Sequence, residues 1–224
     1  MQKNTLIFDL DGTLAHTAPD LIGTLNRIVE PHGLESVEEK SVGHIVGHGA
    51  KAMIQKAFTM SGKELPAKLL DDLFTEFLED YEKNIANESH LFDGIIPSLD
   101  RLEEEGFRFC VCTNKRENMA RILLDIFNIS DRFEALTGGN TYSFSKPDPR
   151  HLRETVKLMG TDIQSAIMIG DSETDINAAK NADIPAIAVS FGYSSKPVNE
   201  LGADIIINHF DELPDAVRQI SRKG

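Results

Sequence analysis

Four short polar clusters carry residue types suited to acid–base and phosphoryl-transfer chemistry. They are D-L-D-G-T-L at 9–14, T-N-K at 113–115, S-K-P-D-P at 145–149 and G-D-S-E-T-D at 170–175. Taken singly, each predicts no more than a turn, a helix cap or a solvated surface lysine. Each also falls at or just after the carboxyl end of an expected strand, and such ends meet at one edge of a parallel sheet. Their convergence therefore predicts a shared site.

Carboxylates dominate this expected site. The side chains that would share the crevice are those of Asp9, Asp11, Asp171 and Asp175. Two such charges about 4 Å apart repel by about 4 kcal/mol at an effective dielectric constant of about 20, so the cluster requires a cation. Hard oxygen ligands with no paired His or Cys nearby favour Mg²⁺ over zinc or copper. Mg²⁺ is accordingly the predicted cofactor.

A phosphoryl group fits beside such an ion, because Mg²⁺ readily shares its coordination shell with phosphoryl oxygens. Lys146 would supply a fixed positive charge, while the Thr113 hydroxyl and the Asn114 backbone N–H would donate to the equatorial oxygens. Together with Asp9, these are the expected phosphate-binding residues.

The corresponding reaction is a hypothesis with defined roles. Asp9 would attack phosphorus in line, since a carboxylate ionised near neutral pH needs no activating base. Asp11 would protonate the leaving alkoxide and then take a proton from water as the acyl-phosphate is hydrolysed. Lys146 completes the predicted catalytic set.

The bulk composition restricts the partners. The chain has 224 residues and a formal net charge of -13, a field that repels nucleic acids and anionic membrane surfaces. Asp9 and Asp11 interrupt the early apolar run, so it forms neither a signal-peptide core nor a membrane span. Cys110 and Cys112 occupy one face of an expected strand, too far apart for a disulfide, and are interpreted as packing thiols in a reducing cytoplasm.

Strands and helices alternate through most of the chain, which predicts an α/β fold with a Rossmann-like doubly wound parallel sheet. Apolar runs predict strands at Thr5–Phe8, Phe107–Cys112, Phe133–Leu136, Ala166–Ile169, Ala186–Val189 and Asp204–Ile207. Amphipathic stretches predict helices at Ile96–Glu105, Met119–Phe127, Arg150–Met159, Asp175–Asn181 and Leu213–Arg222.

The roughly hundred residues between the first two of these strands far exceed one crossover helix. No strand pattern is visible from about 15 to 87; the helical patterns there are Asp20–Glu30, Ala50–Met60 and Lys68–Ile85. The expected domains are a catalytic core of residues 1–14 plus 88–224 and an inserted helical cap of residues 15–87. An insert at this place would lie over the ligand-binding crevice of the sheet.

In order and spacing, the four clusters resemble the motifs of the haloacid dehalogenase superfamily across essentially the whole chain. The resemblance implies a core with a mobile cap, in which Asp9 is the nucleophile and Asp11 the acid/base. It matches the second motif to Thr113 and Asn114, the third to Lys146, and the fourth to Asp171 and Asp175. It further implies that Asp9, the backbone carbonyl of Asp11 and Asp171 hold Mg²⁺, with Asp175 in support.

Within the superfamily, an acid at Asp11 points to phosphoryl chemistry, and Thr13 favours a phosphatase over phosphomutases. Five segments resemble bacterial phosphoglycolate phosphatases: V-G-H-G-A at 46–50, F-D-G at 92–94, C-T-N-K at 112–115, K-P-D-P-R-H-L at 146–152 and F-G-Y at 191–193. Glu173 and Thr174 depart from the residues common in those relatives. The resemblance would place Gly47, His48, Gly49 and Lys51 against a substrate carboxylate, although these glycines equally suit a helix-entry turn.

The expected activity is the Mg²⁺-dependent hydrolysis of 2-phosphoglycolate by a cytoplasmic monomer or homodimer whose partner is a small phosphorylated metabolite. A broad sugar-phosphate phosphatase and a β-phosphoglucomutase-like phosphomutase remain open alternatives. A phospho-aspartate signalling switch is more remote, because receiver domains are single units of about 120 residues without a helical insert.

Overall fold

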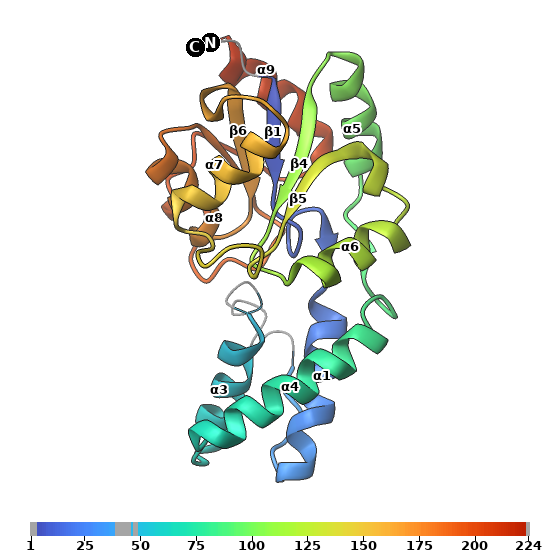
Figure 1. The fold of residues 1–224 in the computed structure, drawn as a ribbon, viewed down its shortest axis with the longest axis vertical. Coiled ribbons are helices and arrows are strands. Elements are labelled where there is room, and N and C mark those ends of the chain that lie inside the picture. Colours follow the sequence, from blue (N-terminus) through green and yellow to red (C-terminus); the bar gives the residue numbers. More distant parts are fainter. Residues whose placement is uncertain (1–3, 39–45, 47–48, 223–224) are drawn as a thin grey trace.

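The computed structural model describes residues 4–38, 46 and 49–222. Its centre is a parallel sheet in the order β5-β4-β1-β6-β7-β8 (Figure 1). The strands are β1 (Thr5–Phe8), β4 (Arg108–Cys112), β5 (Phe133–Thr137), β6 (Ala166–Gly170), β7 (Ala186–Val189) and β8 (Ile205–Ile207). The chain runs outward from β1 in both directions, so the strand order reverses beside β1, where open α/β sheets bind ligands.

The two faces of the sheet are buried by different helices, which confirms the predicted doubly wound α/β fold. Leu6 and Phe8 of β1 join the cluster that includes residues of α5 (Ile95–Glu104), α6 (Glu117–Ile126) and α9 (Leu213–Ser221). Ile7 joins the opposite cluster, with residues of α7 (Pro149–Leu158) and α8 (Glu173–Ala182). Because successive strand side chains point to opposite faces, a wholly apolar strand is the pattern a sheet covered on both sides requires.

The predicted strands are all present, with ends that differ by a residue or so. Helices α7 and α8 begin before the first residue expected, because their capping residues lie further upstream. The Asp148 carboxylate accepts from the Arg150 backbone N–H ahead of Pro149, and the Asp175 carboxylate accepts from the Ser172 N–H at 3.0 Å. Such contacts satisfy the donors that every helix leaves free at its start.

The segment between β1 and β4 contains α1 (Ala18–Val29), α3 (Ala50–Ser61) and α4 (Ala67–Lys83). These helices gather at one end of the sheet-bearing core (Figure 1). The chain leaves and re-enters the core through β2 (Ala15–His16) and β3 (His90–Leu91), which pair antiparallel. The sequence shows no strand pattern at β2 because two residues are too few for alternation to appear. Short 3₁₀ turns occupy Glu30–His32, Ser130–Arg132, Ile163–Ser165, Val198–Glu200 and Phe210–Glu212.

Cys110 and Cys112 lie on β4 as free, buried thiols, as predicted for packing residues. Burial raises the pKa of Cys112 to about 11, and that of Cys110 is raised by the same cause, so neither thiol is poised to react. No helix within the described residues has the length and apolar character needed to cross a membrane.

Candidate active site

The loop after β1 carries Asp9 and Asp11. The Asp9 N–H donates to the Ile169 carbonyl at 3.0 Å, which extends the β1–β6 ladder by one residue and aligns the carboxylate with the carboxyl end of β6. Gly12 then turns the chain back with a φ of +78°, a conformation that residues with a side chain rarely adopt. A Cβ atom at Gly12 would also lie 2.4 Å from Asp171 Oδ2, so the glycine lets the loop approach that carboxylate.

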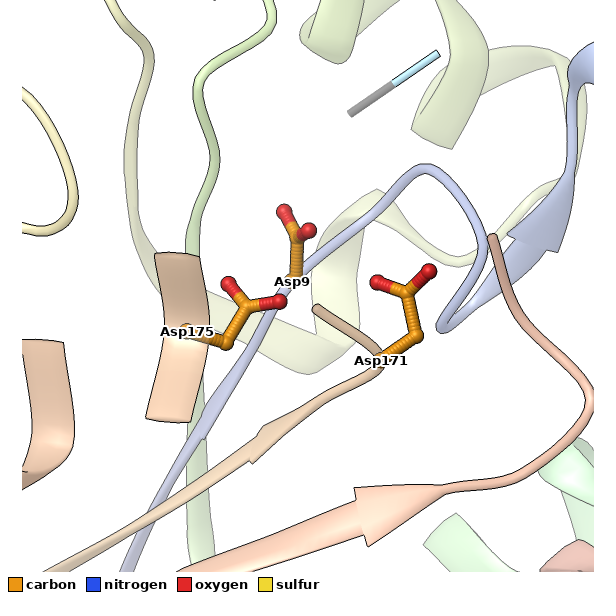
Figure 2. Close-up of side chains that lie close together, drawn as sticks. All are labelled: Asp9, Asp171 and Asp175. Atoms are coloured by element: carbon orange, nitrogen blue, oxygen red, sulfur yellow. The ribbon is translucent and has the colours of Figure 1, made fainter. Parts of the chain in front are cut away.

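Asp9, Asp171 and Asp175 converge at this edge, as Figure 2 shows. Each offers a carboxylate oxygen, and these oxygens lie within 4.8 Å of one another on buried residues. Asp9 follows β1, Asp171 follows β6, and Asp175 lies in the first turn of α8. Asp9 Oδ1 is buried and has no hydrogen-bond partner among the described residues, although Lys146 Nζ lies 2.9 Å away outside hydrogen-bonding geometry.

Burial and the proximity of like charges both disfavour the ionised forms of these carboxylates. Burial raises the pKa of Asp9 to about 6, against the opposing effect of Lys146. Burial, followed by the charges of Asp175 and Asp9, raises the pKa of Asp171 well above its ordinary value. An orphaned carboxylate oxygen within an all-oxygen donor set fits a hard divalent cation such as Mg²⁺.

Lys146 brings the positive charge into the same cluster. Its ammonium lies 2.9 Å from Asp9 and 2.6 Å from Asp175, and its side chain is 1% exposed. Burial by itself would lower the pKa of Lys146, but the two carboxylates outweigh it and hold the pKa above its ordinary value. The Asn114 side chain donates to the Lys146 carbonyl at 3.0 Å, and the His151 ring accepts from the Lys146 N–H at 3.2 Å.

Asp171 and Asp175 differ in how their oxygens are used. Asp175 accepts from Lys146 Nζ on one oxygen and from the Ser172 N–H and hydroxyl on the other. Asp171 Oδ2 accepts from the Tyr193 N–H at 2.6 Å, and its Oδ1 lies 3.4 Å from the Thr13 hydroxyl. Asp175 is therefore arranged to hold Lys146 and the start of α8, whereas Asp171 Oδ1, with only a long hydrogen bond, is more available to a ligand.

Thr113 and Asn114 follow β4, next to β1 in the sheet. The Thr113 hydroxyl is buried and accepts from the Lys115 N–H at 3.1 Å, so its own proton is available to another acceptor. Asn114 Oδ1 is a buried oxygen left unpaired by the part of the chain that the structure describes. Both residues line the same cavity as Asp9.

Asp11 does not point its carboxylate into the triad. It accepts from the Thr17 hydroxyl at 2.7 Å and from Lys115 Nζ at 2.9 Å. Lys115 Nζ also donates to the Tyr81 hydroxyl of α4 at 2.7 Å. Asp11 is thus tied both to the start of the insert and to its last helix.

A cavity of about 290 Å³ lies between the inserted helices and the polar clusters of the core. Its lining from the core includes Asp9, Asp11, Thr113, Asn114, Lys115 and Arg116, and its lining from the insert includes Leu21, Met53, Phe74, Phe77 and Tyr81. Ligand pockets for drug-sized molecules span about 300–1,000 Å³, so this cavity suits a small metabolite.

Two of the four residues predicted to contact the substrate from the cap lie at the cavity wall. Gly49 and Lys51 line this cavity, and Lys51 pairs with Asp71 at 2.6 Å while lying over the Phe74 ring. Gly47 and His48 fall outside the described residues.

Sequence reasoning assigned no role to Lys115, Tyr81 or Tyr193. Lys115 lies in the T-N-K cluster, and its place beside Thr113 was the signal that could have identified it. Tyr193 lies in the F-G-Y segment, where it was noted only as part of a resemblance. Its hydroxyl accepts from the Thr17 and Ala18 N–H groups at 2.8 and 3.0 Å. Tyr81 carried no signal, because in sequence it is one more apolar-face residue of α4.

Comparison with known proteins adds to this geometry. A family model for haloacid dehalogenase-like hydrolases matches residues 6–189. A phosphoglycolate phosphatase from Mesorhizobium japonicum is 41% identical over 213 residues, covering 95% of this chain and 94% of the relative. One from Agrobacterium fabrum is 43% identical over 211 residues, covering 94% and 91%. A crystal structure of a predicted phosphoglycolate phosphatase from Haemophilus somnus superposes with a TM-score of 0.90 at 27% identity, covering 96% and 98%.

Proposed function

The chain belongs to the haloacid dehalogenase-like hydrolases, and from that premise we propose that it is a Mg²⁺-dependent phosphatase that forms an aspartyl-phosphate on Asp9. The observation that carries the proposal is the buried cluster of Asp9, Asp171 and Asp175 with the ammonium of Lys146 inside it. That arrangement is suited to bind a phosphoryl group with an accompanying cation beside a carboxylate.

The first step is an in-line displacement at phosphorus. Asp9 forms the new O–P bond, the bond to the substrate's alkoxide oxygen breaks, and Asp11 gives that oxygen a proton. Lys146, the Thr113 hydroxyl and the Asn114 backbone N–H stabilise the charge on the transferring oxygens. Lys146 is held for this role by Asp175, which is 2.6 Å away.

The second step returns the enzyme to its starting state. Asp11, now ionised, takes a proton from water, and the resulting oxygen nucleophile attacks the phosphorus of the aspartyl-phosphate. The bond between phosphorus and the Asp9 oxygen breaks, releasing inorganic phosphate.

The residues that would hold Mg²⁺ are Asp9, Asp171 and the backbone carbonyl of Asp11, with Asp175 supporting them through Lys146. Bound there, the ion would neutralise the carboxylate cluster and polarise the phosphoryl oxygens. The raised pKa values of Asp9 and Asp171 support this assignment, since both reflect first the burial of the carboxylates and then the repulsion of their acidic neighbours, and a bound cation would relieve both.

We further assign residues 15–87 as a cap domain and residues 1–14 plus 88–224 as the catalytic core. The cavity between them supports this division, because its polar floor comes from one and most of its apolar wall from the other. The favoured substrate is 2-phosphoglycolate, on the similarity to relatives of that name. Gly49 and Lys51, which line the cavity, are the cap positions nearest to a role in selecting it.

A substrate panel tests the proposal. Phosphate release is measured from 2-phosphoglycolate, glucose 1-phosphate and pyrophosphate, each with and without Mg²⁺. We expect Mg²⁺-dependent release with the highest kcat/KM for 2-phosphoglycolate. A broad profile would support the sugar-phosphate alternative, and interconversion of sugar phosphates without net release would support a mutase. Stable phosphorylation of the protein without turnover would overturn the phosphatase assignment in favour of a signalling switch.

A further inference from the structure

Lys115 joins the acid/base carboxylate to the inserted helices, and we propose that Lys115 and Tyr81 are positioning residues that orient Asp11 when α4 is seated on the core. The inference rests on the proposed function, because it concerns the residue assigned there to proton transfer. Neither Lys115 nor Tyr81 touches the reacting atoms in the proposed mechanism, so each acts through Asp11.

The Lys115 ammonium is surrounded by partners. It lies 2.9 Å from Asp11 Oδ1, 3.3 Å from Asp11 Oδ2 and 2.7 Å from the Tyr81 hydroxyl. The same ammonium sits over the Tyr81 ring, 4.4 Å from its centroid. The Lys115 side chain is only 5% exposed, and Tyr81 is 1% exposed. A buried, multiply bonded ammonium has a fixed position, and it therefore fixes the carboxylate it contacts.

The phenol belongs to the insert, whereas Lys115 and Asp11 belong to the core. Tyr81 lies near the end of α4, and burial raises its pKa well above its ordinary value, which keeps it a neutral hydroxyl. The hydroxyl can therefore take a hydrogen bond from Lys115 only while α4 rests against the core. Seating of the insert and orientation of Asp11 are thus coupled through one lysine side chain.

The second partner of Asp11 lies where the chain passes from the core into the insert. Thr17, immediately before α1, donates its hydroxyl to Asp11 Oδ1 at 2.7 Å. Asp11 Oδ1 is consequently held by two donors, and Oδ2 has only the longer contact with Lys115. Asp11 Oδ2 is the oxygen that this arrangement leaves for proton exchange with the leaving group.

A competing role for Lys115 is direct binding of a substrate carboxylate. The geometry favours positioning, because the donors of the ammonium are already engaged by Asp11 and Tyr81. The two roles differ in their dependence on the leaving group. An acid/base residue matters most for an alkoxide, and much less for a stabilised phenolate that leaves without a proton.

The test uses Lys115→Met, which keeps chain length but removes the charge, and Tyr81→Phe, which removes only the hydroxyl. Lys157→Met, at a side chain 74% exposed, and Tyr142→Phe, on a core loop, are the matched controls. For each protein, kcat/KM is measured with 2-phosphoglycolate, ethyl phosphate and p-nitrophenyl phosphate, because kcat/KM reports the steps up to departure of the leaving group.

We expect Lys115→Met to lower kcat/KM about 100-fold for both alkyl phosphates and less than about fivefold for p-nitrophenyl phosphate. Tyr81→Phe should give a smaller loss, about fivefold, with the same preference. In the double variant, the Tyr81 effect should vanish, because Tyr81 acts through Lys115. This comparison of the single and double variants can be made with any one alkyl phosphate that the enzyme hydrolyses. Circular dichroism and melting curves establish that the variants fold.

Equal losses on alkyl and aryl phosphates, or additive losses in the double variant, would overturn the positioning role. A loss confined to KM for 2-phosphoglycolate, with ethyl phosphate unaffected, would overturn it in favour of carboxylate binding. Failure of the proposed function is distinguishable, since the unmodified protein would then hydrolyse no phosphate monoester.

Discussion

The side chain of Asp9 is buried at a position where its ionised form is unfavourable for the stability of the fold. Burial raises its pKa to about 6, and the nearest cation, Lys146, is shared with Asp175. Active sites commonly retain such an unfavourable arrangement because the substrate or its cation relieves it. Asp9, the proposed nucleophile, is thus distinguished both by its position after β1 and by the unfavourable burial of its charge.

Asp9→Asn tests the nucleophile directly. The amide keeps the size of the side chain but cannot form an acyl-phosphate, so we expect turnover to fall by at least about 1,000-fold while the fold is retained. Phosphate release and far-ultraviolet circular dichroism provide the two readouts. Asp72→Asn, at an exposed position of α4, is the control and should leave both unchanged. Undiminished activity in Asp9→Asn would eliminate Asp9 as the nucleophile.

At the scale of elements, the loop after β7 holds Asp171 by close backbone approach. A Cβ atom at Gly192 would lie 2.2 Å from Asp171 Cβ and 2.5 Å from its Oδ2. The next residue, Tyr193, donates its N–H to that same oxygen. The F-G-Y segment therefore supports the Asp171 carboxylate in two ways. Gly192 has no side chain to collide with it, and the Tyr193 N–H donates a hydrogen bond to it.

Gly192→Ala should displace Asp171 and weaken binding of the cation. We expect the Mg²⁺ concentration for half-maximal activity to rise about tenfold or more, since displaced support of a metal ligand typically costs 10–100-fold. Gly23→Ala in α1 is the matched control, because its added Cβ would meet only the flexible Arg27 side chain at 3.3 Å. An unchanged Mg²⁺ requirement in Gly192→Ala would show that the loop does not support Asp171.

Hydrogen bonds also connect the two segments that join the insert to the core, one entering α1 and the other leading into β3. Asp20, buried in the first turn of α1, accepts from the Glu88 N–H, the Ser89 N–H and the Ser89 hydroxyl. These bonds tie the outgoing linker to the returning one beside the β2–β3 pair. The insert is thereby anchored as a unit rather than as two independent strands of chain.

Asp20→Ala removes these acceptors and leaves the buried Ser89 N–H and the partly buried Glu88 N–H unpaired, which should destabilise the protein by about 1–3 kcal/mol. Urea unfolding at neutral pH measures the change. Asp72→Asn again serves as a control, with an expected effect within about 0.5 kcal/mol. A free energy of unfolding unchanged in Asp20→Ala would mean that the linker contacts contribute nothing to stability.

Across the whole molecule, the sequence predicted the features that depend on local pattern. The buried strands and the amphipathic helices appear as expected, and Asp9 and Asp171 meet because they follow the adjacent parallel strands β1 and β6. Lys146 reaches Asp9 from the loop between β5 and α7. Contacts between elements that are distant in the sequence produce no local pattern from which they could be predicted. Lys115 and Tyr81 are 34 residues apart and come together only when α4 packs on the core. The β2–β3 pair was not predicted for a related reason. A strand of two residues is too short to show an alternating pattern and is recognised only from its hydrogen bonds to the partner strand.

The carboxylate cluster should link the stability of the whole chain to pH and, as the proposed cation site, to Mg²⁺. Because folding raises the pKa of Asp9 from 3.8 to about 6, Asp9 contributes stability below pH 4 that is lost as the pH rises through 6. Asp171 shifts in the same direction. In Mg²⁺-free buffer, the stability of the wild type relative to Asp9→Asn should therefore decline between pH 4 and pH 7. The decline in the free energy of unfolding should be at most about 3 kcal/mol, and it is followed as a falling difference between the two melting temperatures.

Mg²⁺ should reverse this decline, since it binds the ionised cluster of the folded state and stabilises the protein by mass action. We expect the Mg²⁺-induced rise in melting temperature to be larger at pH 7.5 than at pH 5, and to be reduced in Asp9→Asn at both. Thermal melts with Mg²⁺ and with a chelator, at the two pH values, provide the measurement. A rise that is equal at both pH values and unaffected by Asp9→Asn would place the cation elsewhere, because only binding at the buried carboxylates competes with their protonation.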